Sequence, residues 1–142
     1  MSLTAVRPYF RARLNSLGYK EWDDAFYAEN IPENIIDKAY HIDANEINRA
    51  SFSQTDLQLE HVVTTRLFFK GFFTPKDALD KTMERLDAIL KEVLKPSNRL
   101  TGTSGLRNVD LQSVSIEPLA DSNNNTLMVL LTWNVQVNLC TT

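Results

Sequence analysis

The alternation of side chains near the C-terminus constrains the fold more than any other feature of this sequence. Between positions 126 and 140 every odd position is apolar, and most even positions are polar. The apolar residues are Leu127, Val129, Leu131, Trp133, Val135, Val137 and Leu139. A period of two over this length predicts a β-strand with one buried face. Because a slip of one residue would turn all these apolar side chains toward water, the pattern also fixes the register of the strand.

A second long strand is predicted from Leu57 to Phe69, with one apolar and one mainly polar face. The apolar face holds Leu57, Leu59, Val63, Leu67 and Phe69, and the opposite face holds Gln58, Glu60, Thr64, Arg66 and Lys70. Strands of about 13–15 residues span roughly 43–50 Å, whereas a globule of this size has a radius of gyration of about 14–15 Å. We therefore expect both strands to project from the body of the protein or to bend around it.

Two amphipathic helices are predicted to cover the sheet. Residues 4–17 have apolar side chains at helical spacing, and Gly18 is a typical helix stop. The second helix is predicted at 75–94, with Pro75 at its first position and Thr74 as its N-cap. Its apolar positions are Leu79, Met83, Leu86, Leu90 and Val93. Because charged residues occupy most of the remaining positions, this helix is expected to lie with one face on the sheet.

The segment between the first helix and the long strand is less regular. Residues 19–34 are rich in aromatic side chains, which predicts a loop packed on the sheet. A short strand is predicted at 36–42 from apolar residues of one parity. Residues 43–55 are polar and without a pattern, which predicts a long connection of the kind that is usually functional or flexible.

The C-terminal third predicts a long hairpin. In the strand predicted at 109–118, the parity of the apolar residues shifts between Leu111 and Val114, which indicates either a bulge or burial on both faces. Residues 121–125 have the composition of a turn. The sequence thus predicts one α+β domain over 1–142, in which two amphipathic helices pack on a mixed, mainly antiparallel sheet that ends in a long hairpin.

Composition argues against several classes of function. A formal net charge of −3 argues against a protein that binds nucleic acid mainly by neutralising phosphates. The single cysteine, Cys140, can form neither an internal disulfide nor a thiolate metal site, which favours a reducing compartment during assembly. No apolar run approaches the ~20 residues of a membrane helix, and the N-terminus has no signal-peptide core.

The sequence contains no recognisable catalytic constellation. It has no nucleophile elbow, Walker loop or paired zinc spacing. His41 and His61 each have a neighbouring carboxylate but no converging set of metal ligands, and we interpret His61 as a core or interface residue. Residues 101–105 could cradle an anion, but no lysine or helix start follows them. We therefore expect no enzyme, no cofactor and no metal site.

The order and lengths of these elements resemble one known family. The shared features are the long strand at 57–69, the Pro-capped helix at 75–94 and the terminal strand pair. Two local matches are Leu17-Gly18-Tyr19 followed by Trp22, and Asn30-Ile31-Pro32 before Tyr40-His41-Ile42. With these features, over nearly its whole length, the chain is similar to the tail-terminator proteins of long-tailed, siphovirus-type bacteriophages.

This resemblance implies a structural virion protein rather than an enzyme. Family members form a ring, typically hexameric, that caps the tail tube, ends its polymerisation and offers a surface for head attachment. The implied partners are copies of the same chain, the tail-tube protein and a head-completion or connector protein, and DNA only passes through the channel, toward which members often carry an acidic face. The implied location is the head-proximal end of the virion tail, and the host cytoplasm during assembly.

A candidate contact surface lies on the polar face of the strand at 57–69. There Phe68 lies between Arg66 and Lys70, as an apolar anchor with a charged rim would. We expect these three residues to contact a neighbouring subunit or the end of the tail tube. Two other functions stay open: a neck or head-completion connector subunit between portal and tail, and a monomeric enzyme of unknown chemistry.

Overall fold

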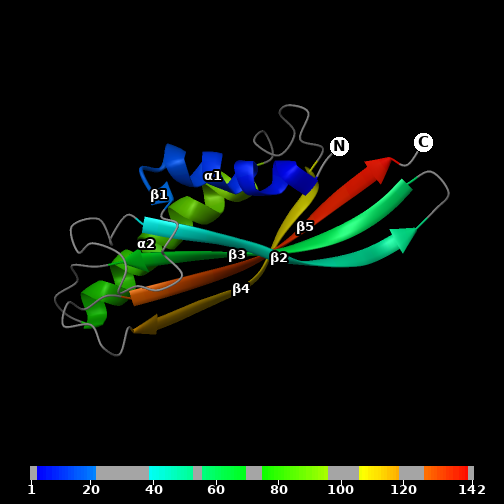
Figure 1. Cartoon of the computed structure of the whole chain (residues 1–142). Helices are drawn as coiled ribbons and strands as arrows, with labels where there is room; N and C mark the ends of the chain where they lie inside the picture. The colour runs from blue at the N-terminus through cyan, green and yellow to red at the C-terminus, as the bar shows by residue number, and fades with distance from the viewer. Residues whose placement is uncertain are drawn as a thin grey trace.

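The body of the protein is a strongly twisted β-sheet with helices packed on one face (Figure 1). The computed structural model describes residues 3–21, 39–52, 56–69, 75–95, 106–118 and 127–140. In chain order the elements are η1 (Leu3–Ala5), α1 (Val6–Ser16), β1 (Lys20–Glu21), β2 (Ala39–Phe52), β3 (Asp56–Phe69), α2 (Pro75–Leu94), β4 (Leu106–Pro118) and β5 (Leu127–Cys140). The fold class is α+β, as the sequence predicts.

The two strands with the clearest alternation form the centre of the sheet. The strand order is β1-β2-β3-β5-β4, and only the β1–β2 pair is parallel. β3 and β5 pair without a register shift from Asp56 opposite Cys140 to Phe69 opposite Leu127. The strands twist so far that their order from top to bottom reverses between the two ends of the sheet, and β2, β3 and β5 extend beyond α1 (Figure 1). The expectation of long strands that project from the body is confirmed.

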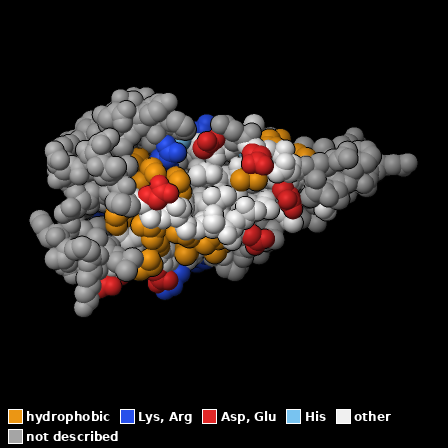
Figure 2. Space-filling model, turned by 90° about the horizontal axis from the view of Figure 1, so that it is seen from below, with side chains coloured by type: hydrophobic (Ala, Val, Ile, Leu, Met, Phe, Trp, Pro, Cys, Tyr) orange, Lys and Arg blue, Asp and Glu red, His pale blue; other side chains and the backbone are white. Residues whose placement is uncertain are grey.

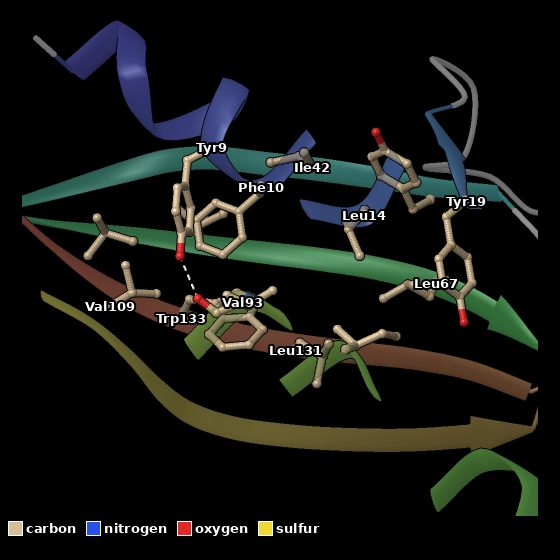
Figure 3. Packing of buried hydrophobic residues seen from close by; sticks show 14 of the residues in the cluster. Tyr9, Phe10, Leu14, Tyr19, Ile42, Leu67, Val93, Val109, Leu131 and Trp133 are labelled. Carbon is tan, nitrogen blue, oxygen red and sulfur yellow. Dashed lines mark hydrogen bonds between the residues drawn. The ribbon is translucent and has the colours of Figure 1, made fainter. Parts of the chain in front are cut away.

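The hydrophobic core lies between the sheet and the helices. The odd residues Val129, Leu131, Trp133, Val135 and Val137 of β5 are all fully buried. The ring of Phe10 on α1 lies against Trp133, with 5.5 Å between the ring centroids (Figure 3). Tyr9 on α1 donates its hydroxyl hydrogen to the carbonyl oxygen of Val93 on α2, which joins the two helices over the core (Figure 3).

The ends of α1 follow from its sequence. Pro8 lies in the first turn, where a backbone N–H would have no acceptor within the helix. At the other end, Gly18 has a φ of +93°, a conformation that a residue with a side chain rarely adopts. The backbone N–H of Tyr19 reaches back to the carbonyl oxygen of Leu14 at 3.2 Å, and this turn leads directly into β1.

Bulges interrupt the outer strands and leave the central pair regular. In β4 the register with β5 shifts between Leu111 and Ser113, so Leu111 and Val114 both lie on the helix-covered face. The parity shift in the sequence is therefore a bulge, and burial on both faces is not needed to explain it. In β2 the register with β3 shifts between Asp43 and Glu46.

The prediction of a long connection at residues 43–55 is wrong for residues 43–52. The polar residues 43–52 do not form a connection, because β2 continues through them to Phe52 and pairs with β3. The backbone hydrogen bonds of β3 hold this segment in the sheet although its own apolar pattern is weak. Residues 53–55 of the predicted connection lie outside the described residues.

The predicted contact face of the second helix is confirmed in part. Among the side chains of α2 that the structure describes, Thr82, Leu86, Ile89 and Val93 are buried, and Leu90 packs partly against the core. Met83 is 47% exposed, so its predicted place on this face is wrong, and the neighbouring Thr82 is buried instead. Four further predictions concern positions outside the described residues: Thr74, residues 22–34, residues 101–105 and the turn at 121–125.

Candidate functional site: the open face of the sheet

The face of the sheet opposite the helices is covered by neither of the described helices α1 and α2. It is formed by the even residues of β3 and β5 with their partners in β2 and β4, and we call it the open face. Its central residues are half-buried: Val62, Thr64, Arg66, Leu130, Thr132 and Asn134. Figure 2, which views the molecule from below, shows acidic side chains around a middle of uncharged polar and apolar groups.

Acidic groups predominate on the open face. Among its described side chains are the carboxylates of Asp43, Glu46, Glu60, Asp110 and Glu117, against the single guanidinium of Arg66. They come from β2, β3 and β4, and the alternation of side chains along each strand places them on one side of the sheet. Because the whole chain has a formal charge of only −3, this gathering is a property of the fold and not of the composition.

Basic groups are gathered on the helical side of the molecule. The exposed or half-buried basic side chains there are Arg7, Arg11, Arg13, Lys20, Lys81, Arg85, Lys91 and Lys95. Several pair with carboxylates: Glu21 accepts from Arg11 at 2.5 Å and from Arg7 at 3.2 Å. The protein therefore presents an acidic sheet face and a mixed, more basic helical layer.

Arg66 lies on the open face, as predicted from the sequence. It is half-buried and stands opposite His41 of β2, so it is in position to touch a partner. Lys70, the third residue of the predicted contact, lies outside the described residues.

The exposure expected for Phe68 is wrong. Its side chain is only 1% exposed, although it lies on the same face as Arg66. It pairs with Met128 and lies one residue beyond the Tyr40–Leu67 pair, next to the start of β2, where Ala39 is 2% exposed. This end of the face is therefore closed within the chain, and Phe68 stabilises the fold there rather than anchoring a partner.

Of the acidic residues of the open face, the sequence placed only Glu60 there. Asp43 and Glu46 fall in the segment predicted to be a connection, and only the pairing with Thr64 and Val62 of β3 places them on this face. One signal could have found them: a strand as long as β3 needs a neighbour of similar length to satisfy its backbone groups.

No cluster of three or more potential metal-ligating side chains occurs among the described residues. A surface of carboxylates on a rigid sheet can attract basic protein surfaces and repel phosphate groups.

Comparison of the sequence with known proteins identifies no relative of this chain. The chain matches no protein-family model, and no curated protein is significantly similar to it. In the described part of the chain, no helix is long and apolar enough to cross a membrane.

Proposed function

We propose that this chain is a structural subunit of a bacteriophage tail, a tail-terminator protein that assembles into a ring. The ring, expected to be hexameric, caps the tail tube at its head-proximal end, stops its polymerisation and receives the head. One observation carries the proposal: the open face is acidic while the opposite face is filled by helices. The resemblance in element order and length supports it independently.

An acidic wall suits a channel through which DNA only passes. Phosphates would bind to a wall of lysine and arginine, because neutralising them releases counterions. The carboxylates of Glu46, Glu60 and Asp110 would instead repel the duplex and leave it free to slide. In this arrangement the open faces of all subunits turn inward, and the helical layer with its paired charges forms the outside of the ring.

Co-assembly with a tail-tube protein tests the function. The purified chain, mixed with tube protein of the same phage, should bind tube ends and stop elongation, which electron microscopy of tube lengths would show. Native mass measurement of the capped end should give a ring of identical subunits. Tubes of unchanged length, or binding to portal protein instead of tube protein, would contradict a terminator and favour a neck connector or another function.

A charge reversal tests the inward orientation of the open face. Glu60→Lys should leave tube capping intact but slow the release of DNA from assembled particles, because it puts a cation on the channel wall. Glu84→Lys is the matched control, since Glu84 is an exposed residue of α2 on the helical side. Equal release from both variants would contradict the inward orientation.

A further inference from the structure

Both long outer strands have an edge without a partner strand among the described residues. β1 covers the outer side of β2 only at Ala39 and Tyr40. β4 pairs with β5 on one side and is the last strand of the sheet on the other. Each edge thus presents a row of backbone N–H and C=O groups that can pair with another chain.

Each of these edges also carries an exposed aliphatic side chain on the same face. Ile47 of β2 is 44% exposed, and its partner in β3, His61, is 5% exposed. Val114 of β4 is 39% exposed, and its partner in β5, Leu131, is fully buried. Both side chains lie on the helix-covered face, and with Met83 they are the exposed large hydrophobic residues of the described chain.

The directions of the two edges are compatible with a head-to-tail contact. β2, β3, β5 and β4 alternate in direction, so β2 and β4 run opposite to each other within one subunit. If a second copy is placed beside the first in the same orientation, its β4 meets the outer edge of β2 as an antiparallel strand. Such a contact uses two different surfaces, can be repeated, and closes into a ring when the rotation per copy allows it.

Each exposed aliphatic side chain lies in a regular segment of its strand, next to a bulge. In β2 the regular segment between its two register shifts is Glu46–Arg49, and in β4 the regular segment after its last shift begins at Ser113. If Ile47 faces Val114, antiparallel pairing sets Glu46 opposite Ser115 and Asn48 opposite Ser113. All four of these polar side chains lie on the open face, and no two carboxylates face each other.

We propose that Glu46–Arg49 of one subunit pairs with the β4 segment that begins at Ser113 in the next subunit, with Ile47 against Val114. The occupant of each edge is thus a second copy of this chain. In the joined sheet every open face lies on the same side. The edge contact stands by itself, and only the closure of the joined subunits into a ring rests on the proposed function. Ile47 is aligned with Val135 of β5 through His61, and Val114 is aligned with Leu131, so the two positions are offset by four residues along β5, or ~13 Å. Tilted strands in a closed sheet need an offset of this kind.

Cysteine cross-linking tests this contact in the full chain. The background variant is Cys140→Ser, because Cys140 is the only cysteine. A chain with both Ile47→Cys and Val114→Cys, treated at high protein concentration with a short bis-maleimide, should give a ladder of covalent oligomers. Each single variant alone should give none, and a mixture of the two single variants should stop at dimers.

Other outcomes separate the edge contact from the ring. Ladders or dimers from one single variant alone would mean a contact between identical edges and would overturn the proposal. Rings in native mass measurement without the double-variant ladder would overturn the edge contact but leave the ring function standing. A cross-linked ladder from a protein that fails to cap tubes would support the contact and contradict the terminator function.

A charge pair provides a second measurement on folded protein. Ile47→Lys and Val114→Glu should each abolish oligomers by leaving a charge unpaired at the contact, with unchanged circular dichroism. A chain with both substitutions should recover them, since the lysine of one copy meets the glutamate of the next. Loss without recovery in a folded double variant would overturn the pairing of these two positions.

Discussion

The indole nitrogen of Trp133 donates a hydrogen bond to the hydroxyl oxygen of Thr65 on the neighbouring strand, over 3.1 Å. Thr65 in turn lies 3.5 Å from the carbonyl oxygen of Leu131, to which its hydroxyl can donate. Trp133 is fully buried and Thr65 is 1% exposed. The largest side chain of the core therefore has its one polar atom satisfied by the one hydroxyl within reach.

Removing either partner of this bond should destabilise the protein. Thr65→Val keeps the shape but leaves the buried N–H without an acceptor, and should lower the free energy of unfolding by ~1–3 kcal/mol. Trp133→Ala also leaves a cavity and should cost ~3–5 kcal/mol. Urea unfolding would measure both, with Thr64→Val, on the open face of the same strand, as the control expected within about 0.5 kcal/mol of wild type. A Trp133 emission typical of a hydrated indole would contradict its burial.

Phe68→Asp should unfold the subunit rather than merely disconnect it from a partner. The side chain is 1% exposed, so the substitution buries a carboxylate and should cost on the order of 4 kcal/mol or more. Thr132→Asp is the matched control on the open face, where the residue is half-buried and pairs with Thr64 and Ser113 rather than with a carboxylate. Thermal unfolding followed by circular dichroism compares the two. A Phe68→Asp protein as stable as the control would show that Phe68 is accessible.

Tyr40 makes the stability of the fold sensitive to alkaline pH. Burial, with a smaller contribution from the nearby Glu21 carboxylate, raises the pKa of Tyr40 to about 12, against the lowering effect of Arg11. Its hydroxyl donates to the side-chain oxygen of Asn15 at 2.7 Å. Because the folded pKa exceeds the unfolded value of about 10, this stabilisation is complete below pH 10 and is lost as pH rises through 12.

Substituting Tyr40 by Phe isolates this effect. Between pH 10 and 12 the stability of wild type should fall relative to Tyr40→Phe with a slope approaching about 1.4 kcal/mol per pH unit. Urea midpoints measured from pH 8 to 11.5 give the difference directly, and the other tyrosines cancel in the comparison. Parallel pH profiles for the two proteins would contradict the raised pKa.

The acidic open face should cost the isolated subunit some stability at low salt. Glu46 pairs with Val62 and Glu60 with Asn48, so the two carboxylates are diagonal neighbours on adjacent strands. Glu46→Gln with Glu60→Gln should raise the free energy of unfolding by ~0.2–1 kcal/mol at low ionic strength. In about 1 M salt the gain should vanish, since the screening length falls to about 3 Å. A gain that persists in high salt would mean that packing, not repulsion, separates the variants.

The sequence by itself determined the centre of this protein. The alternation of β5 selected its buried face, and the alternation of β3 selected its own, because a residue period of two leaves no other way to bury those side chains. That these two strands are neighbours came only from the structure. The parity shift between Leu111 and Val114 indicated either a bulge or burial on both faces for the same reason, and the register with β5 identifies the bulge. In all three cases the signal was local, since it depended only on which side of a strand each residue faces.

Tertiary structure alone decided the outer parts. Residues 43–52 join the sheet because β3 offers them backbone partners. The polar side chains of Asp43, Glu46 and Asn48 suit an open face at an edge, where an apolar pattern is not needed. Phe68 is buried although it lies on the open face, because this end of the face is covered within the chain. Met83 is exposed because Thr82, Leu86, Ile89 and Val93 together form the face of α2 that packs on the core. The acidic surface arises in the same way: carboxylates far apart in the sequence meet only when strand order and register bring four strands side by side.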